Sequence, residues 1–308
     1  MTTLIATSVV RGSNQGESHG GVYLIDLDKQ DVRQVIDWNR SDIDWSGRGW
    51  DRGLRGIAFD GDTVYIAASD ELFAYTTRFQ PLGSWRNPYL KHCHEIAIQG
   101  RRLFLSSTGF DAVLGFDLDR GLFDWGLRVE GKGPTLATRL FDPRAAAGPP
   151  ARNTLHLNNV YCDQSGLYIG GLRTGGLLRF DGRRIGVVAE LPEGSHNARP
   201  FSDGVLFNDT EADALRYCSR TDPGSDRALA VPAYPREDLQ QLDADASGIA
   251  RPGFGRGLCV CPGELIAGGS SPSTVTLYDL AANQRVLAVN LSMDVRNAIH
   301  GLAVWPYQ

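Results

Sequence analysis

The sequence has few of the features that mark membrane, nucleic-acid-binding or secreted proteins. No apolar run approaches the roughly 20 residues that a membrane-spanning helix needs. The first ten residues lack the basic start and long apolar stretch of a signal peptide. No basic cluster occurs and the formal net charge is −5, which argues against nucleic acid as a partner. We therefore expect a cytoplasmic protein that binds neither membrane nor nucleic acid.

Cysteine pairs of the CxxC type are also missing. The chain has five cysteines, an odd number, and the two closest are Cys259 and Cys261 on one expected strand. A two-cysteine metal site is one interpretation of this pair. Buried thiols in a reducing cytosol are the better one, because the cysteines are odd in number and form no CxxC pair.

Helical periodicity is scarce, whereas glycine is abundant, with 36 residues. Runs of four to eight strand-forming residues alternate with turn residues along the whole chain, which predicts an all-β protein. A chain of 308 residues suffices for one large domain or for two smaller ones.

A short motif recurs six times: a histidine or an arginine at the entrance of an apolar run, as in His300-Gly-Leu-Ala-Val. The six positions are Arg55, His94, His156, His196, Arg256 and His300. They are separated by 39, 62, 40, 60 and 44 residues, and each period holds three or four strand-like runs. Four-stranded units of about 40 residues are typical of β-propeller blades.

We therefore predict a single six-bladed β-propeller over residues 1–308. Its inner strands begin near residues 55, 94, 156, 196, 256 and 300. The last blade needs both chain ends, with an inner strand at 301–305 and outer strands at 4–9, 21–26 and 32–38. Five or seven blades remain alternatives, because strand boundaries taken from a sequence are loose.

Three long connections, 39–54, 130–155 and 232–255, precede inner strands and so belong on one face of a propeller. Long loops over one face usually shape a binding site. The first holds Trp45 and Trp50, and the third suggests a helical turn at 236–242. Shorter loops with His19, and with Asn208 and Asp209, should reach the same face.

The first residue of each propeller inner strand points toward the central channel, so the six repeated residues should form a ring. Four imidazoles, those of His94, His156, His196 and His300, suit a transition metal. Fe(II) is our first choice, with copper, manganese or zinc behind it. Glu95 and Asp209 could fix the imidazole tautomers, and Glu211 is a further candidate for that role.

The two arginines of the ring, Arg55 and Arg256, suit an anionic small-molecule substrate, which guanidinium groups bind by paired hydrogen bonds. We expect Arg55, Arg256 and Glu95 to be catalytic. The expected substrate-binding residues are Arg55, Arg256, His19, His92, Asn208, Asp209, Trp45 and Trp50.

The sequence resembles six-bladed propellers of the SMP-30/gluconolactonase, strictosidine-synthase-like and NHL-repeat group along its whole length. The gluconolactonase-like members hold calcium with a glutamate, two asparagines and an aspartate, and Asn158, Asn208 and Asp209 match part of that set. The four-histidine plan is similar to that of carotenoid oxygenases, which hold Fe(II) on a seven-bladed propeller. It also resembles virginiamycin B lyase and oligogalacturonate lyase, which place a divalent metal beside axial histidines.

These observations leave three functions open. The first is a metal-dependent enzyme that acts on an anionic small molecule, with oxygenase chemistry slightly favoured over lyase or hydrolase chemistry. The second is metal-free acid–base catalysis by histidine, with arginine stabilising an oxyanion. The third is a propeller that binds a ligand or a protein without catalysis. The sequence gives no sign of an oligomeric state.

Overall fold

The computed structural model describes residues 2–14, 16–39, 53–243, 248 and 250–307. They form six β-sheets, and short 3₁₀ helices occur between some of the strands. The fold is an all-β six-bladed β-propeller, as the repeat predicts. Among the described residues, no helix has the length and apolar character to cross a lipid bilayer. The predicted substrate contacts Trp45 and Trp50 lie outside the described residues.

The chain forms two compact units. The central unit comprises residues 56–207, and the terminal unit comprises residues 1–55 and 208–308. One sheet has the strand order β17 (Ser195–Phe201), β18 (Gly204–Asp209), β19 (Ala214–Ser219) and β20 (Arg227–Ala230). The division of the chain falls within β18.

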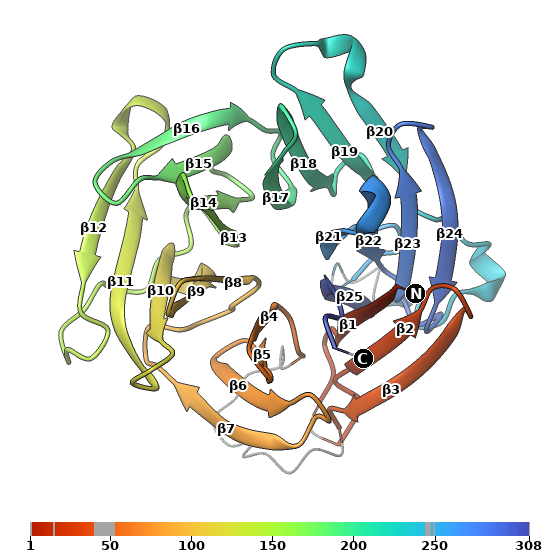
Figure 1. Ribbon diagram of the computed structural model, residues 1–308, viewed down its shortest axis with the longest axis horizontal. Helices are drawn as coiled ribbons and strands as arrows, with labels where there is room; N and C mark the ends of the chain where they lie inside the picture. Colours follow the sequence, from red (N-terminus) through yellow and green to blue (C-terminus); the bar gives the residue numbers. More distant parts are fainter. Residues whose placement is uncertain (1, 15, 40–52, 244–247, 249, 308) are drawn as a thin grey trace. The chain divides into compact units, whose positions relative to one another are not determined.

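Three sheets lie in the central unit (Figure 1). The first contains β4 (Ile57–Asp60), β5 (Thr63–Ala67), β6 (Glu71–Thr76) and β7 (Pro81–Arg86). The second contains β8 (Ile96–Gln99), β9 (Arg102–Ser107), β10 (Ala112–Asp117), β11 (Leu122–Glu130) and β12 (Ala137–Phe141). The third contains β13 (Leu157–Asp163), β14 (Gly166–Gly171), β15 (Gly176–Phe180) and β16 (Ile185–Glu190). The 3₁₀ helices η1 (Thr108–Phe110) and η2 (Gly133–Thr135) join strands of the second sheet.

Two sheets lie wholly in the terminal unit. One contains β21 (Leu258–Val260), β22 (Leu265–Ser270), β23 (Thr274–Asp279) and β24 (Gln284–Asn290). The other has the order β25 (Asn297–Val304), β1 (Thr3–Val10), β2 (Gly21–Asp26) and β3 (Asp31–Asp37). The last strand of the chain thus pairs with the first, as predicted, and Figure 1 shows both chain ends at this sheet.

Hairpin turns of one type follow the third strand of several sheets. The carboxylates of Asp26, Asp117 and Asp181 each accept hydrogen bonds from the main-chain N–H groups two and three residues later. These bonds lower the pKa of all three carboxyl groups. Asp279 accepts one such bond, from Ala282. The recurring apolar-Asp dipeptides of the sequence therefore end strands by the same side-chain turn.

Apolar side chains fill the space between neighbouring sheets within each unit. In the central unit one cluster joins the first and second sheets, with Leu72, Leu103 and Phe116 buried in it. A second cluster joins the second and third sheets. In the terminal unit a third cluster joins the β25-β1-β2-β3 sheet to the β21–β24 sheet. The second sheet is thus covered on both faces, and its strands have the short apolar runs expected of buried strands.

Two predicted loops differ in the structure. The connection 130–155 is not all loop, because residues 137–141 form β12, a fifth strand on the second sheet. In the connection 232–255 the helical turn is shorter than predicted. It is the 3₁₀ helix η4 (Arg236–Asp238), which Pro235 precedes and which ends at Leu239, whose main-chain N–H donates to the oxygen of Arg236.

Candidate functional site

Three of the predicted ligand histidines lie at the start of inner strands in the central unit. His94 comes two residues before β8, His156 directly before β13, and His196 is the second residue of β17. His94 and His196 are buried, and His156 is partly exposed. The imidazole rings of His94 and His156 lie edge to face, with 5.9 Å between their centroids. The structure therefore brings this pair together, as the ring of inner strands predicts.

The Nδ1 atoms of two histidines contact main-chain carbonyl oxygens two residues earlier in the chain. His94 Nδ1 lies 2.7 Å from the oxygen of His92, and His196 Nδ1 lies 3.0 Å from that of Gly194. A carbonyl oxygen only accepts hydrogen bonds, so both Nδ1 atoms hold the ring proton. In both residues Nε2 is therefore the ring nitrogen that these contacts do not involve.

Hydroxyl groups at the end of β9 fix the segment that contains His94. Ser106 Oγ accepts hydrogen bonds from the main-chain N–H groups of His94 and Glu95, at 3.1 and 3.0 Å. Thr108 Oγ1 lies 3.0 Å from His94 Nδ1 and 2.8 Å from the oxygen of His92. These contacts give the imidazole of His94 a single orientation.

Asp111 holds the segment that leads to His156. Its carboxylate accepts main-chain N–H groups from Thr154 at 2.6 Å, Leu155 at 3.0 Å and His156 at 2.9 Å. Asp111 is buried and has a left-handed backbone with φ of 47°. The sequence gives no signal for this residue, because its contacts reach more than 40 residues along the chain.

Asparagine side chains link the inner strands of the central unit. Asn159 donates to the main-chain oxygen of Ala198 at 2.6 Å, and Asn197 donates to the carboxylate of Glu95. Asn158 Nδ2 lies 3.4 Å from the oxygen of Ser195. Asn158 is 1% exposed, and its Oδ1 has no hydrogen-bond partner within the described parts of the chain. A buried oxygen of this kind is a candidate acceptor for a ligand or a water molecule.

The remaining ring residues, Arg55, Arg256 and His300, lie in the terminal unit. A nitrogen of the buried Arg256 guanidinium lies 2.7 Å from His300 Nε2. Since a guanidinium only donates, Nε2 of His300 accepts this bond. The Arg55 side chain is buried, and its main-chain oxygen accepts the hydroxyl of Thr7.

Three guanidinium groups surround one phenyl ring in the terminal unit. The guanidinium carbons of Arg256, Arg11 and Arg251 lie 4.6, 4.7 and 5.2 Å from the centroid of Phe254. Arg251 also forms an ion pair with Asp213, at 2.7 Å. Such an assembly concentrates positive charge around an aromatic wall and suits an anion.

The predicted four-histidine metal site stays a prediction. Within the described ranges, no group of three or more histidine, cysteine or acidic side chains is arranged to hold a metal ion. The Nε2 lone pair of His300 is directed at Arg256, which competes with a role as metal ligand. His94 and His196 have the Nδ1 contacts to carbonyl oxygens that ligating histidines usually make.

Other predicted site residues have partners that fix the local structure. Asp209 forms an ion pair with Arg216 at 3.1 Å, and Asn208 donates to the main-chain oxygen of Gly257. His19 Nδ1 lies 2.7 Å from Ser13 Oγ. His92 Nδ1 lies 3.3 Å from the hydroxyl of Ser69.

All five cysteines are free thiols, and Cys93, Cys259 and Cys261 are buried. Burial raises the pKa of the Cys162 thiol to about 12, so it is not a nucleophile at neutral pH. A hydrogen bond from Cys259 lowers the pKa of Cys261.

No protein-family model matches the sequence, and no curated protein matches it. Solved structures do match. The nidogen/laminin complex contains a chain 12% identical to this one, with a TM-score of 0.63 and a match covering 99% of this chain and 98% of that one. A protein of unknown function from Bacteroides caccae is 10% identical, with a TM-score of 0.56 and 99% of both chains covered. At these identities the likeness supports the propeller fold alone.

Proposed function

We propose that the protein is an enzyme that moves a proton between a small molecule and the histidines of the central unit. His94 and His196 are the expected proton-transfer groups, and His156 lies beside His94. The supporting observation is that both Nδ1 atoms donate to main-chain oxygens, at 2.7 and 3.0 Å. This arrangement leaves Nε2 as the site that takes up or releases a proton.

Neighbouring groups support this role. Glu95, between His94 and strand β8, accepts a hydrogen bond from the Asn197 side chain. Asn158 has a buried oxygen able to accept a hydrogen bond from a substrate hydroxyl. The chemistry that suits neutral imidazole and carboxylate together is lyase, isomerase or hydrolase chemistry rather than group transfer.

A metal-dependent enzyme is the second candidate, and the same observation favours it. Ligating histidines typically donate Nδ1–H to a carbonyl and bind the metal through Nε2. A divalent transition metal such as Fe(II), copper, manganese or zinc on these Nε2 atoms would supply Lewis acidity or bind oxygen. The central unit alone would have to hold it, with His94, His156 and His196 as ligands.

The expectation of an anionic ligand has its support in the terminal unit. There the guanidinium groups of Arg11, Arg251 and Arg256 surround Phe254, and the Arg256–His300 contact fixes one of them. We propose that this cluster binds a carboxylate or phosphate. Replacing Arg256 with glutamine would then weaken the binding of small carboxylates by about tenfold, the effect of losing one charge-assisted hydrogen bond.

The test is a long-range ¹H–¹⁵N spectrum of the histidine side chains near pH 7.5. His94→Gln, His156→Gln and His196→Gln assign the signals, and His19→Gln is the control. We expect neutral, Nδ1-protonated rings at His94 and His196. A charged ring or an Nε2-protonated ring at either residue would contradict the proposal.

Titration of the same sample with Mn(II), Zn(II) or anaerobic Fe(II) separates the two candidates. Stoichiometric changes at the Nε2 signals of His94, His156 and His196 support the metal-dependent enzyme. If the Nε2 signals do not change when metal is added, the result supports metal-free acid–base catalysis. In turnover assays on hydroxy acids, lactones and uronates, His196→Gln should then lower the rate at least ~100-fold while ligand binding persists.

A further inference from the structure

A pocket of about 340 Å³ lies between the edge strand β12, its neighbour β11 and the loop that follows β12. Its lining is Arg128, Arg139, Leu140, Phe141, Ala147, Gly148, Pro149 and Pro150. None of these residues belongs to the histidine site, so the pocket is independent of the function proposed above. Its volume is within the range of small-molecule sites.

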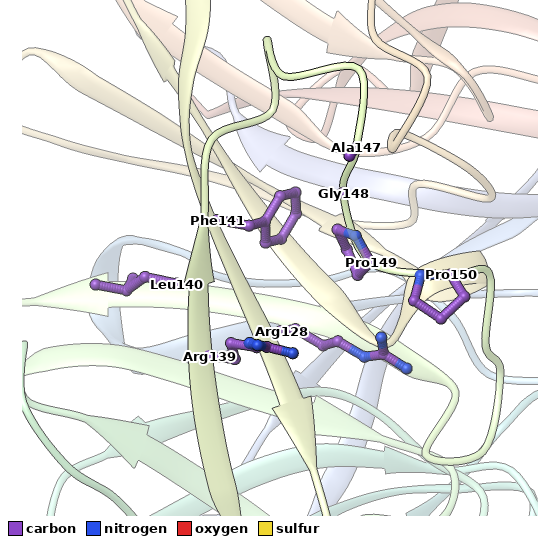
Figure 2. Close-up of a pocket in the computed structure, with 8 residues that line it drawn as sticks. All are labelled: Arg128, Arg139, Leu140, Phe141, Ala147, Gly148, Pro149 and Pro150. Carbon is purple, nitrogen blue, oxygen red and sulfur yellow. The ribbon is translucent and has the colours of Figure 1, made fainter.

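Two arginines lie side by side at this pocket. Arg128 on β11 and Arg139 on β12 are directly opposed in the antiparallel ladder. Like charges at directly opposed positions destabilise a sheet, so this pair has a cost that an anion between the two guanidiniums would remove. Figure 2 shows the Arg128 side chain extending toward the Pro149–Pro150 segment, with Arg139 beside it.

The guanidinium of Arg128 is buried rather than solvated. Its side chain is 7% exposed, and its Nε lies 3.1 Å from Glu130 Oε1 without hydrogen-bond geometry. Within the described residues this buried N–H therefore has no hydrogen-bond partner. The Glu130 carboxylate offsets one of the two arginine charges, which leaves a net charge of +1 for these three side chains. Buried donors usually have hydrogen-bond partners, so we expect an oxygen of a bound ligand to accept from the Arg128 guanidinium.

The apolar wall of the pocket is preformed. The Phe141 ring lies over Gly126, where a Cβ would be within 2.5 Å of ring carbon, so only glycine allows this packing. Phe141 packs edge to face on Tyr89, with 5.5 Å between centroids. The Tyr89 hydroxyl donates to the main-chain oxygen of Ala145 at 3.0 Å and thereby holds the loop against the sheet.

The beginning of the loop is fixed as well. Asn87 donates to the main-chain oxygen of Pro143 at 3.0 Å. Arg144 forms paired hydrogen bonds with Asp142 and lowers the pKa of that carboxyl to about 2. Prolines 149 and 150 restrict the chain further on. A site whose walls are already in place loses little conformational entropy on binding.

We propose that this pocket binds a small carboxylate with an apolar ring, such as an aromatic acid. The two guanidiniums of Arg128 and Arg139 bind the carboxylate oxygens, and Phe141 with Pro149 and Pro150 contacts the ring. Planar carboxylates match the guanidinium fork, and aromatic and proline side chains provide a flat apolar surface for a ring.

The experiment is an NMR titration of the full-length protein with benzoate, following the backbone amide signals of residues 126–150. Benzamide is the neutral analogue, and phenyl phosphate and inorganic phosphate test for other anions. We expect benzoate to shift signals of β11, β12 and residues 147–148, and benzamide to bind at least about tenfold more weakly. Absence of shifts at millimolar benzoate, or equal binding of benzamide, would overturn the proposal.

Variants locate the binding. Arg139→Gln is on an exposed edge strand and should weaken benzoate binding about tenfold or more. Arg128→Lys keeps the charge but not the fork, and is also expected to weaken binding. Arg78→Gln, at an exposed hairpin turn, is the matched control. Equal weakening by Arg78→Gln and Arg139→Gln would show non-specific charge attraction and reject the site. Tighter binding of inorganic phosphate than of benzoate would reject an aromatic acid as the ligand.

Discussion

At the scale of single residues, Asp111 shows how a side chain outside the histidine set positions one of its members. One buried carboxylate accepts three consecutive main-chain N–H groups, of residues 154 to 156, and so places His156 at the start of β13. Thr108 has a similar part for His94, through its contact with Nδ1. Charged acceptors make hydrogen bonds roughly twice as strong as neutral ones, so Asp111 should be the more important of the two.

Replacing Asp111 with asparagine tests this role. Asparagine tolerates the left-handed backbone of this position but has no charge, and its amide group opposes a main-chain donor. We expect Asp111→Asn to lower the free energy of unfolding by about 3 kcal/mol, the cost of weakening several charge-assisted bonds in a buried site. Urea unfolding followed by tryptophan fluorescence measures this change.

The control for Asp111→Asn is Asp62→Asn, in an exposed hairpin turn of the central unit. Its expected effect is within about 0.5 kcal/mol. If both variants unfolded at the same urea concentration, Asp111 would not be the anchor of the 154–156 segment. The NMR signals of His156 should move in Asp111→Asn and stay in place in Asp62→Asn.

Such residue-level contacts were beyond the reach of sequence analysis, and the reason is distance along the chain. The histidines were found because they repeat at one position of each period. Asp111 and Thr108 do not repeat, and their partners lie more than 40 residues away or in another strand. The contact between Arg256 and His300 also joins two repeats, so the ring could be predicted but not which of its members bind each other.

At the scale of elements, alternating burial and turn chemistry made most strands predictable. Strand β2, Gly21–Asp26, has the predicted bounds, because Gly21 and the Ile25-Asp26 dipeptide mark its ends. Strand β12 was missed because it is an edge strand with largely exposed side chains and no apolar alternation. Only its pairing with β11 identifies residues 137–141 as a strand.

Close approach of strands in the terminal unit leads to a second prediction, at Gly301 of β25. A Cβ there would lie 2.1 Å from the main-chain oxygen of Arg55 and 2.6 Å from Thr7 Oγ1. Thr7 itself accepts the N–H of Gly301 at 2.8 Å and donates to Arg55. Gly301→Ala should therefore force β25 away from this bonded network and cost about 3 kcal/mol.

The comparison for Gly301→Ala is Gly186→Ala on the exposed strand β16, where a Cβ meets no atom within 4 Å. That change should be neutral or slightly stabilising, because alanine reduces the freedom of the unfolded chain. Thermal unfolding of the two variants is the measurement. A Tm for Gly301→Ala equal to that of the wild type would contradict the close approach.

At the scale of the whole molecule, the pairing of β1 with β25 joins the two ends of the chain in one sheet. Leu4 is paired with Val304 and Val10 with Asn297, so the two strands are antiparallel along their length. The contact Trp305 N to Thr3 O, at 2.8 Å, continues the pairing beyond the strand. A propeller closed by strands from both ends leaves no blade with an open inner edge.

This closure predicts that removing residues 1–10 abolishes cooperative folding. Strand β1 pairs on both sides, with β2 and with β25, so its loss exposes two strand edges. It also removes the buried side chains of Leu4, Ile5, Val9 and Val10. At about 2 kcal/mol for each, their loss of roughly 8 kcal/mol equals the whole stability of a typical domain.

Circular dichroism and urea unfolding of the truncated chain should show no single transition, whereas removal of residues 306–308, beyond β25, should leave the transition intact. A cooperative transition in the first truncation would show that the other sheets fold without the terminal strand, and closure would then not be what makes folding all-or-none.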